Sequence, residues 1–302
     1  MNVTIIVVSY NTCNILQQCL MYLEELTDAF NAQVIIVDNA SSDGSAEMVE
    51  TCFPLYTLIR NQKNLGFACA NNQGIRFAKG EFILLLNSDA FLTAEALQVL
   101  IDYAVQHNKV GICGPQLINS DGTWQRSYGL IPSPRSAILD ALGFTSLRHV
   151  VFKALWKLTG DYWRPKSVEY VDGACLLIRR AVIEQIGVLD ERFFFFVEDA
   201  DFCHRAWQRG WKVAYVPKSR VLHLRGQSSS KKNASHSQQL MRHSLQAFVT
   251  AHYGLHGWNT YCHWMRRNFW WRFRLCAFFS RFDLTSTENC EKYLNTYATY
   301  EQ

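Results

Sequence analysis

Short apolar runs alternate with amphipathic stretches through the first 115 residues, and this alternation constrains the fold more than any other feature. The apolar runs cover residues 3–8, 33–37, 56–59, 81–86 and 110–113. Short, near-continuous apolar character is typical of strands that are buried on both faces. The stretches between them have amphipathic, helix-like patterns at residues 14–26, 45–53, 67–78 and 93–106. The alternation predicts an α/β fold whose mostly parallel sheet is flanked by helices.

Polar side chains follow three of these predicted strands. The clusters are Ser9-Tyr10-Asn11, Asp38-Asn39 and Asn87-Ser88-Asp89. Ligands on a sheet of this kind bind outside the carboxyl ends of the strands. We therefore expect these clusters to lie at the ligand-binding edge of the sheet.

The pattern loosens between residues 119 and 166, where glycine and proline interrupt it. We expect a mobile connection there, with a short helix near residues 148–158. A second ordered block follows, with strands predicted at residues 174–178 and 212–216 and helices from Arg180 and over 200–208. Beyond a polar stretch, helical periodicity continues through His252. The expected division is one domain over 1–228 and a helical C-terminal region over 229–302.

The ten cysteines form no C-x-x-C pair, and the first residues carry no basic leader. Thiols in a chain without an export signal are most simply reduced, which predicts a cytoplasmic protein. Residues 200–282 hold 14 Lys and Arg against one acid, so the remainder, with 16 basic and 25 acidic residues, carries −9. A split of this size predicts that the C-terminal third faces something anionic.

The segment 258–282 contains ten aromatic residues and five arginines, with no acid. Such a segment can lie on an anionic membrane surface with its aromatics in the interface. Two alternatives are nucleic-acid binding and a helix that simply docks on the core. No apolar run is long enough to span a bilayer. We expect peripheral association with the inner face of the cytoplasmic membrane and no nucleic-acid partner.

Asp38 ends a buried strand, so its carboxylate can accept a hydrogen bond from the imide N–H of uracil or thymine, which adenine lacks. The alternative is a capping or turn residue. Asp89 also follows a buried strand and can hold a divalent cation that neutralises a diphosphate leaving group. Asn87 offers a neutral amide oxygen, which makes a weaker or indirect ligand. The alternative for Asp89 is an N-cap of the next helix.

The segment FFFFVEDAD at residues 193–201 places three carboxylates behind an apolar run. A carboxylate against an apolar wall is partly desolvated and therefore more basic toward an incoming hydroxyl. The alternative is another capped helix start. His223 ends a later strand-like run, where a neutral imidazole can complete a metal site with Asp89 or have a structural role.

Taken together, these segments resemble the family 2 glycosyltransferases, and within them the rhamnosyltransferase-like branch. The matching stretches are VVSYN (7–11), VDNASSDGS (37–45), NLGFACANNQG (64–74), LLLNSDA (84–90), DGACLLIRR (172–180) and VEDADFCHRAWQRGW (197–211). The resemblance implies a GT-A-type, Rossmann-like fold with a nucleotide-binding half at about 1–115 and a catalytic half at about 166–228. It fades beyond residue 228.

The resemblance also implies residue roles. Asp38 would read the pyrimidine, with Ser9, Asn64, Asn71 and Ser88 in the nucleotide site. Asn87-Ser88-Asp89 replaces the family's Asp-x-Asp metal motif, so Asp89 is the retained ligand of Mg²⁺ or Mn²⁺. Asp199 would be the general base beside Glu198, and His223 a late metal ligand.

The expected reaction is a single displacement, in which a nucleoside-diphosphate sugar donates to a hydroxyl of a glycan or lipid-linked glycan acceptor. One base and no second nucleophile imply inversion. The resemblance favours dTDP-L-rhamnose over UDP-hexoses and a role in cell-surface polysaccharide synthesis. A dehydrogenase would need G-x-G-x-x-G after the first strand, and a nucleotidyltransferase a basic, Gly-rich loop there, and residues 7–14 have neither. A non-catalytic carbohydrate- or lipid-binding protein stays open.

Overall fold

The computed structural model describes residues 2–144, 147, 151, 164–224, 234–280, 296–297 and 300. They fall into two compact units, residues 1–130 with 163–241, and residues 131–162 with 242–302. Apart from residue 151, the helix predicted near 148–158 lies outside the described residues.

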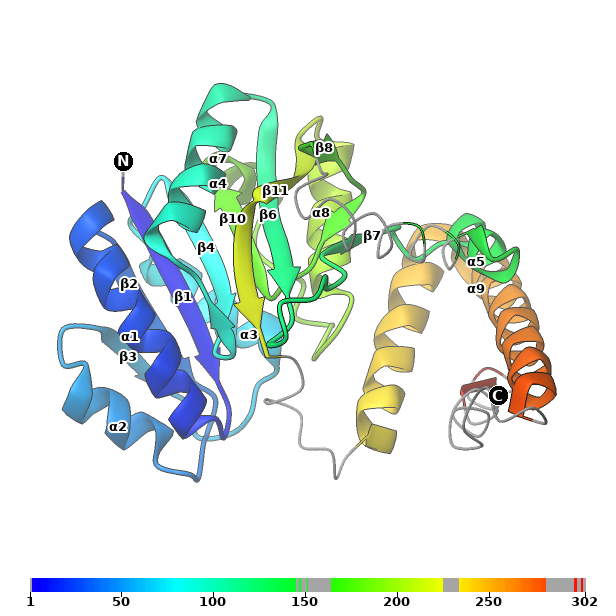
Figure 1. The fold of residues 1–302 in the computed structure, drawn as a ribbon, viewed down its shortest axis with the longest axis horizontal. Coiled ribbons are helices and arrows are strands. Elements are labelled where there is room, and N and C mark those ends of the chain that lie inside the picture. The colour runs from blue at the N-terminus through cyan, green and yellow to red at the C-terminus, as the bar shows by residue number, and fades with distance from the viewer. Residues whose placement is uncertain are drawn as a thin grey trace. The chain divides into compact units, whose positions relative to one another are not determined.

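The first unit is built on a sheet of nine strands among the described residues (Figure 1). Its order is β3 (Thr57–Arg60), β2 (Gln33–Asp38), β1 (Val3–Ser9), β4 (Phe82–Asn87), β10 (Cys175–Arg179), β6 (Val110–Ile118), β11 (Lys212–His223) and β5 (Ala90–Phe91), with β8 (Lys166–Ser167) on β11. The pairs β1–β2, β1–β4, β2–β3 and β6–β11 are parallel. β10 runs antiparallel between β4 and β6. The predicted mostly parallel α/β sheet is confirmed.

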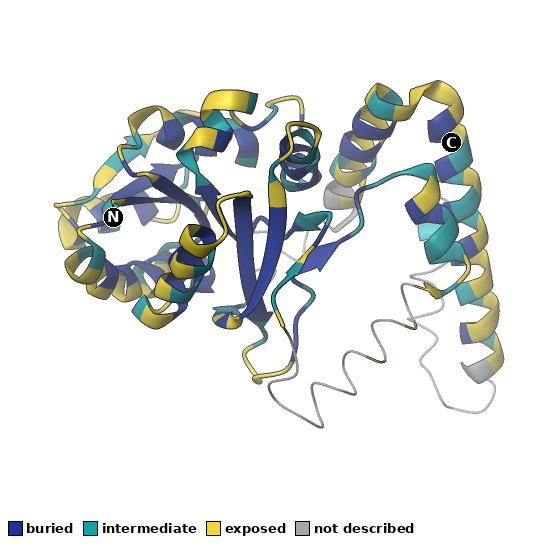
Figure 2. Ribbon diagram, turned by 90° about the horizontal axis from the view of Figure 1, so that it is seen from above, coloured by how far each residue is buried: buried dark blue, intermediate teal, exposed yellow. Residues whose placement is uncertain are grey.

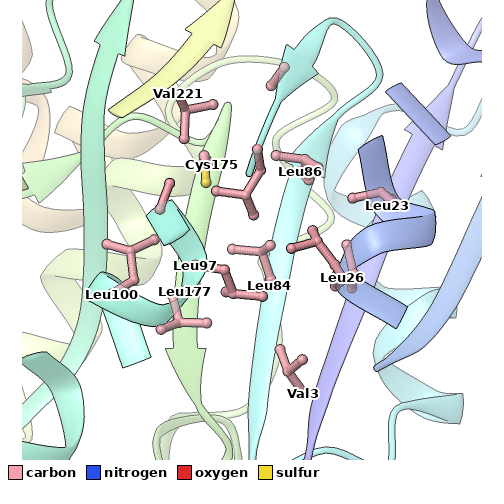
Figure 3. Packing of buried hydrophobic residues seen from close by; sticks show 14 of the residues in the cluster. Val3, Leu23, Leu26, Leu84, Leu86, Leu97, Leu100, Cys175, Leu177 and Val221 are labelled. Carbon is pink, nitrogen blue, oxygen red and sulfur yellow. The ribbon is translucent and has the colours of Figure 1, made fainter. Parts of the chain in front are cut away.

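Helices cover both faces of this sheet. α1 (Cys13–Phe30) and α4 (Ala94–Gln106) bury Leu16, Leu20, Leu97 and their neighbours in one core cluster with alternate residues of the strands (Figure 3). α3 (Phe67–Phe77) packs on the other face, where a side chain at Gly74 would meet Ile6. The central strands are therefore buried on both sides, as their apolar runs predict (Figure 2).

Three further helices of the described residues belong to the first unit. α2 (Ser45–Cys52) follows β2, α7 (Arg180–Ile186) follows β10, and α8 (Glu198–Gln208) precedes β11. A second, two-stranded sheet pairs β7 (Tyr128–Gly129) with β9 (Tyr170–Val171). The stretch expected to be a loose connection therefore contains paired backbone.

The second unit contains α5 (Pro134–Ala141) and most of α9 (Ala234–Ser280). Ser133 and Ser136 form a reciprocal capping box at the start of α5, and Pro134 occupies the first turn. α9 is broken at Gly254, whose φ of 69° lies in the left-handed region. Among the described residues, no helix is both long and apolar enough to span a bilayer.

Candidate active site

The carboxyl ends of β1, β2 and β4 meet at one edge of the sheet. Ser9 is paired in register with Asp38, and Val8 with Asn87. Thr12 joins the ends of β1 and β4, because its hydroxyl lies 3.0 Å from that of Ser9 and donates to Ser88 Oγ at 3.1 Å. The polar clusters predicted to share this edge do so, while Thr12 was missed.

Asp38 is buried and uses only one carboxylate oxygen within the protein. Its Oδ2 accepts a hydrogen bond of 3.0 Å from the backbone N–H of Ser41. With this oxygen Asp38 acts as a turn residue, which was the alternative interpretation. Its Oδ1 is buried and has no hydrogen-bond partner among the described residues. Because buried carboxylate oxygens are normally satisfied, Oδ1 is an acceptor available to a ligand.

Asn64 and Asn71 both make hydrogen bonds inside the protein. Asn64 Oδ1 accepts from Asn39 Nδ2 at 2.8 Å and from the backbone N–H of Gly66 at 2.9 Å. Asn71 is buried in α3, and its amide donates to Phe67 O at 3.0 Å. The structure thus places Asn64 in the loop beside Asp38 and Asn71 within the helix that follows. Their contacts with a nucleotide stay predictions.

Asp89 and His223 come together although they lie far apart in the sequence. β5 pairs with the end of β11, with His223 opposite Ala90, and Leu224 N donates to Asp89 O at 3.0 Å. His223 Nε2 therefore lies 3.3 Å from Asp89 Oδ1, and the two residues are 7% and 1% exposed. Asp89 does not cap the following helix, since Thr93 accepts from Ala96 N there. The capping alternative for Asp89 is therefore wrong.

The chemistry of this pair fits a divalent cation. Asp89 Oδ1 is buried and accepts no hydrogen bond from a described residue. It lies close to His223 Nε2, and when that nitrogen carries no hydrogen both atoms are acceptors. A cation or a proton between them would make the short distance favourable. The Asn87 side chain makes no hydrogen bond within the described ranges. No group of three or more His, Cys, Asp or Glu side chains converges as a metal cage in the described part of the chain. The protein therefore offers two strong ligands.

The acidic segment begins α8. Asp199 Oδ2 accepts from the backbone N–H of Gly173 at 2.9 Å, and Oδ1 accepts from that of Ala200 at 2.7 Å. Burial, with the nearby charge of Asp172 adding to it, raises the pKa of Asp199 to about 7. Burial and the charge of Asp199 raise the pKa of Glu198 well above its usual value. Both effects match the prediction that these carboxylates are desolvated.

The third carboxylate of this segment has a different role. The buried carboxylate of Asp201 forms an ion pair of 2.7 Å, from Oδ2 to Nε of the partly exposed Arg205, one turn along α8. Of the three carboxylates, Glu198 has a pKa raised well above its usual value by burial, and Asp201 is paired with Arg205. Asp199 is therefore the carboxylate best suited to accept a proton near neutral pH.

The base and the cation pair are linked through one loop. Gly173 donates to Asp199, and the next residue, Ala174, accepts a 3.0 Å hydrogen bond from Asn87 N. Asn87 is two residues from Asp89 on the same turn. The loop before β10 therefore connects Asp199 with the carboxyl end of β4, and Asp172 and Gly173 were not identified as parts of the site from the sequence.

The backbone before the base is strained. Phe196 and Val197 have φ angles of 68° and 74°, which a β-branched residue such as Val197 rarely adopts. Gly66 packs against this segment, because an added Cβ would clash with Phe194 O. Phe67 N also donates to Phe194 O at 2.8 Å. The loop before α3 therefore supports the segment that leads to Asp199, and strain of this kind is common at functional sites.

Comparison with known proteins identifies the class. The sequence profile of glycosyl transferase family 2 matches residues 4–187. Over 252 residues the chain is 28% identical to the N-acetylglucosaminyl-diphospho-decaprenol L-rhamnosyltransferase of Mycobacterium tuberculosis, covering 77% of this chain and 79% of that protein. The chain belongs to glycosyl transferase family 2 and is rhamnosyltransferase-like, which confirms the resemblance inferred from its motifs.

Solved structures share the fold. The mannosyltransferase PcManGT of Pyrobaculum calidifontis, in complex with GDP-Man and Mn²⁺, gives a TM-score of 0.59 at 18% identity, over 99% of this chain and 76% of that one. TarS residues 1–349 of S. aureus, in complex with UDP-GlcNAc, gives a TM-score of 0.55 at 16% identity, over 89% and 73%. At these identities the likeness establishes the architecture, and it confirms the predicted GT-A-type fold.

Proposed function

We propose that this glycosyltransferase moves L-rhamnose from dTDP-L-rhamnose to a hydroxyl of a lipid-linked glycan, with inversion, in cell-surface polysaccharide synthesis. The observation that carries the reaction type is the hydrogen-bonded connection from Asp199, through Gly173 and Ala174, to the turn that holds Asp89. It joins a base with a pKa of about 7 to a pair of cation ligands. The mycobacterial relative supports the sugar and the acceptor class.

In this proposal Asp199 accepts the proton of the acceptor hydroxyl while that oxygen attacks the anomeric carbon. The bond from this carbon to the diphosphate breaks, and the nucleoside diphosphate leaves with the electron pair. Asp201 is paired with Arg205, and with Asp199 as the one base and no second nucleophile assigned, the displacement has one step and inverts the configuration. Asp199 is well matched to this task, since a general base works best with a pKa near the operating pH.

Asp89 and His223 would hold Mg²⁺ or Mn²⁺, and a cation there supplies positive charge for the departing diphosphate. Divalent cations in such sites are commonly bound by one or two protein ligands together with substrate phosphates. Two buried ligands with an unsatisfied oxygen fit that arrangement. Asn87, at the same turn, would contribute at most a neutral or indirect contact.

A donor competition tests this function. The protein is incubated with Mn²⁺, polyprenyl-diphospho-GlcNAc and equal amounts of dTDP-rhamnose, UDP-GlcNAc and GDP-mannose, and release of each nucleotide is measured. We expect dTDP to be released fastest and only in the presence of acceptor. Faster release of UDP would reject rhamnose as the sugar and favour another UDP-activated donor. Release of no nucleotide would favour a non-catalytic carbohydrate-binding protein.

Asp38→Ala is expected to lower the affinity for dTDP by about 5- to 150-fold, because a buried hydrogen bond to the base is worth about 1–3 kcal/mol. Affinity for ADP, which lacks the imide N–H, should be weak in both proteins and change little. Calorimetry with the two nucleotides measures both values. Asp43→Ala is the matched control, since Asp43 lies in the same loop but bonds to Cys13 N and Ser45. Equal binding of ADP and dTDP by the unchanged protein would contradict the role of Asp38.

We also propose that the second unit associates with an anionic membrane surface. In α9, four large apolar side chains are 41–54% exposed on one helix face: Trp270, Trp271, Leu275 and Phe278. Arg267 and Arg274 lie on the same face, each stacked on a tryptophan. Residues 242–280 contain five arginines and no acid. With this composition, the aromatic side chains can be buried in the membrane interface while the arginines contact lipid phosphates.

Co-sedimentation with vesicles tests this placement. Binding by the full chain should require anionic lipid and fall as salt rises, since the charge interaction is screened over roughly 8 Å at physiological ionic strength. Trp270→Ser with Trp271→Ser, and separately Arg267→Gln with Arg274→Gln, should each lower binding. Leu55→Ser is the control, because Leu55 is also an exposed apolar residue but lies in the first unit. A full chain that stays in the supernatant at low salt would reject the proposal.

A further inference from the structure

Gln125 is a buried glutamine at the edge of the candidate active site, outside every motif of the sequence analysis. It lies in the connection after β6, where Asn119 and Thr123 close a tight turn and Ile118 is bridged to Trp124. Its backbone N–H donates to Leu117 O at 3.0 Å. The tight turn and the hydrogen bond to Leu117 O together fix the backbone of Gln125. From that position its side chain contacts His223.

The hydrogen bonds of the Gln125 side chain determine which way its amide group points. Its Nε2 donates to Asn119 Oδ1 at 2.8 Å and to the backbone carbonyl of His223 at 3.1 Å. Two acceptors on that side require the NH₂ group there, which places Oε1 toward the imidazole. Oε1 lies 2.7 Å from His223 Nδ1. An amide oxygen can only accept, so Nδ1 must carry a hydrogen.

This assignment decides the state of the other ring nitrogen. A neutral imidazole with its hydrogen on Nδ1 has a lone pair on Nε2. Nε2 is the atom that lies 3.3 Å from the unsatisfied Oδ1 of Asp89. Without the Gln125 acceptor, the imidazole would be free to carry its hydrogen on Nε2 and donate it to Asp89. That arrangement would satisfy both residues and remove the lone pair that a cation needs.

We propose that Gln125 is a positioning residue for cation binding: it holds His223 in the tautomer, and in the orientation, that presents Nε2 as a ligand beside Asp89. This deepens the proposed function and rests on its cation pair, but not on the identity of the sugar. The Gln125 side chain forms hydrogen bonds with both the imidazole ring and the backbone carbonyl of His223. Partners of this kind, one step removed from the ion, typically change metal affinity by about 10- to 100-fold.

The test measures Mn²⁺ affinity by electron paramagnetic resonance, with dTDP present and no sugar donor, so that no turnover is needed. Gln125→Leu keeps the approximate size but removes the acceptor, and we expect it to weaken Mn²⁺ binding about 10- to 100-fold. Gln125→Glu keeps an accepting oxygen toward Nδ1 but loses the two hydrogen bonds that Nε2 donates, so its Mn²⁺ affinity should fall less than that of Gln125→Leu. Affinity for dTDP without metal should be the same in all three.

Asn119→Ala is the control for general disturbance, because it removes one support of Gln125 but leaves Oε1 facing His223. Its Mn²⁺ affinity should fall less than that of Gln125→Leu. A Gln125→Leu protein that is folded and binds Mn²⁺ like the unchanged protein would overturn the proposal while leaving the proposed function intact. An unchanged protein that binds no Mn²⁺ with dTDP would overturn both the proposal and the metal ligand pair.

A second measurement does not depend on any variant folding. Nitrogen-15 NMR of histidine in the unchanged, metal-free protein reports which ring nitrogen carries the hydrogen. We expect the neutral His223 ring to show a protonated Nδ1 and a bare Nε2. A neutral His223 with its hydrogen on Nε2 would overturn the proposal, even if rhamnose transfer is observed.

Discussion

Asp199→Asn is expected to lower turnover by about 10²- to 10⁴-fold, the range over which a positioned general base contributes. Asparagine keeps the shape and can still accept from Gly173 N, but it cannot take the proton of the acceptor hydroxyl. Affinity for the donor nucleotide should stay close to that of the unchanged protein, because in the described part of the chain Asp199 is linked to the nucleotide edge through the backbone of residues 173–174. Steady-state kinetics and calorimetry measure the two quantities.

The same residue predicts the pH dependence. The pKa of Asp199 is raised to about 7 by burial and then by the charge of Asp172, so the base is protonated and inactive in acid. Turnover should therefore rise with pH through about 7 and level off above it. A rate that is already constant from pH 5 upward would contradict Asp199 as the base.

The raised pKa also affects stability, with a definite sign. Between the usual carboxyl pKa of 3.8 and about 7, the folded protein binds more protons at Asp199 than the unfolded chain does. This group's contribution to the free energy of unfolding therefore falls as pH rises through that window. Asp199→Asn lacks the effect, so its melting temperature should gain relative to the unchanged protein between pH 5 and pH 8.

Asp201→Asn is the matched control for Asp199. It removes a carboxylate from the same helical turn, but one that is paired with Arg205. We expect this variant to keep most of its turnover and to lose stability, because the ion pair between the buried carboxylate and Arg205 is lost. If Asp201→Asn abolished turnover while Asp199→Asn did not, the assignment of the base within residues 198–201 would be wrong.

Asp89→Ala is the second change expected to have a large effect. Removing a buried carboxylate beside His223 should lower metal-dependent turnover by about 10²-fold or more, since a cation contributes several kcal/mol to stabilising the departing charge. Binding of Mn²⁺ with dTDP should weaken in parallel, and chelator should abolish turnover of the unchanged protein. Asp102→Ala, at an exposed position of α4, is the control. Full activity of Asp89→Ala in the presence of chelator would exclude a cation at this pair.

Much of the fold could be predicted because buried strands have a strong local signature. The runs at β1, β2 and β4 are apolar on both faces, which only a covered sheet explains. The order and direction of the strands could not be predicted in this way. Periodicity shows that β10 is buried but not that it runs antiparallel between β4 and β6. α5 was missed although its Ser133-Pro134 start is a local helix signal. The helical periodicity predicted through His252 ends two residues before the break of α9 at Gly254, and the chain beyond it was expected to be helical only as part of the region 229–302.

In the candidate site, too, some residues could be predicted from the sequence and others could not. Asp89 and His223 were predicted as partners from their positions at strand ends and from the resemblance, and β5 brings them together. Thr12, Gln125 and Gly173 act through distances that no spacing rule encodes, because each contacts a residue on another element. Gln125 and His223, for example, are 98 positions apart. A sequence indicates which side chains can carry chemistry more readily than which neighbours orient them.

The stereochemistry of transfer tests the central claim most directly. The protein is incubated with dTDP-rhamnose, Mn²⁺ and polyprenyl-diphospho-GlcNAc, and the anomeric configuration of the product is determined by NMR from the carbon–hydrogen coupling at the anomeric carbon. A single displacement assisted by Asp199 predicts a product whose anomeric configuration is opposite to that of the donor. A product with retained configuration would contradict the account, because it requires a second displacement or a front-side mechanism that one base at residue 199 does not provide.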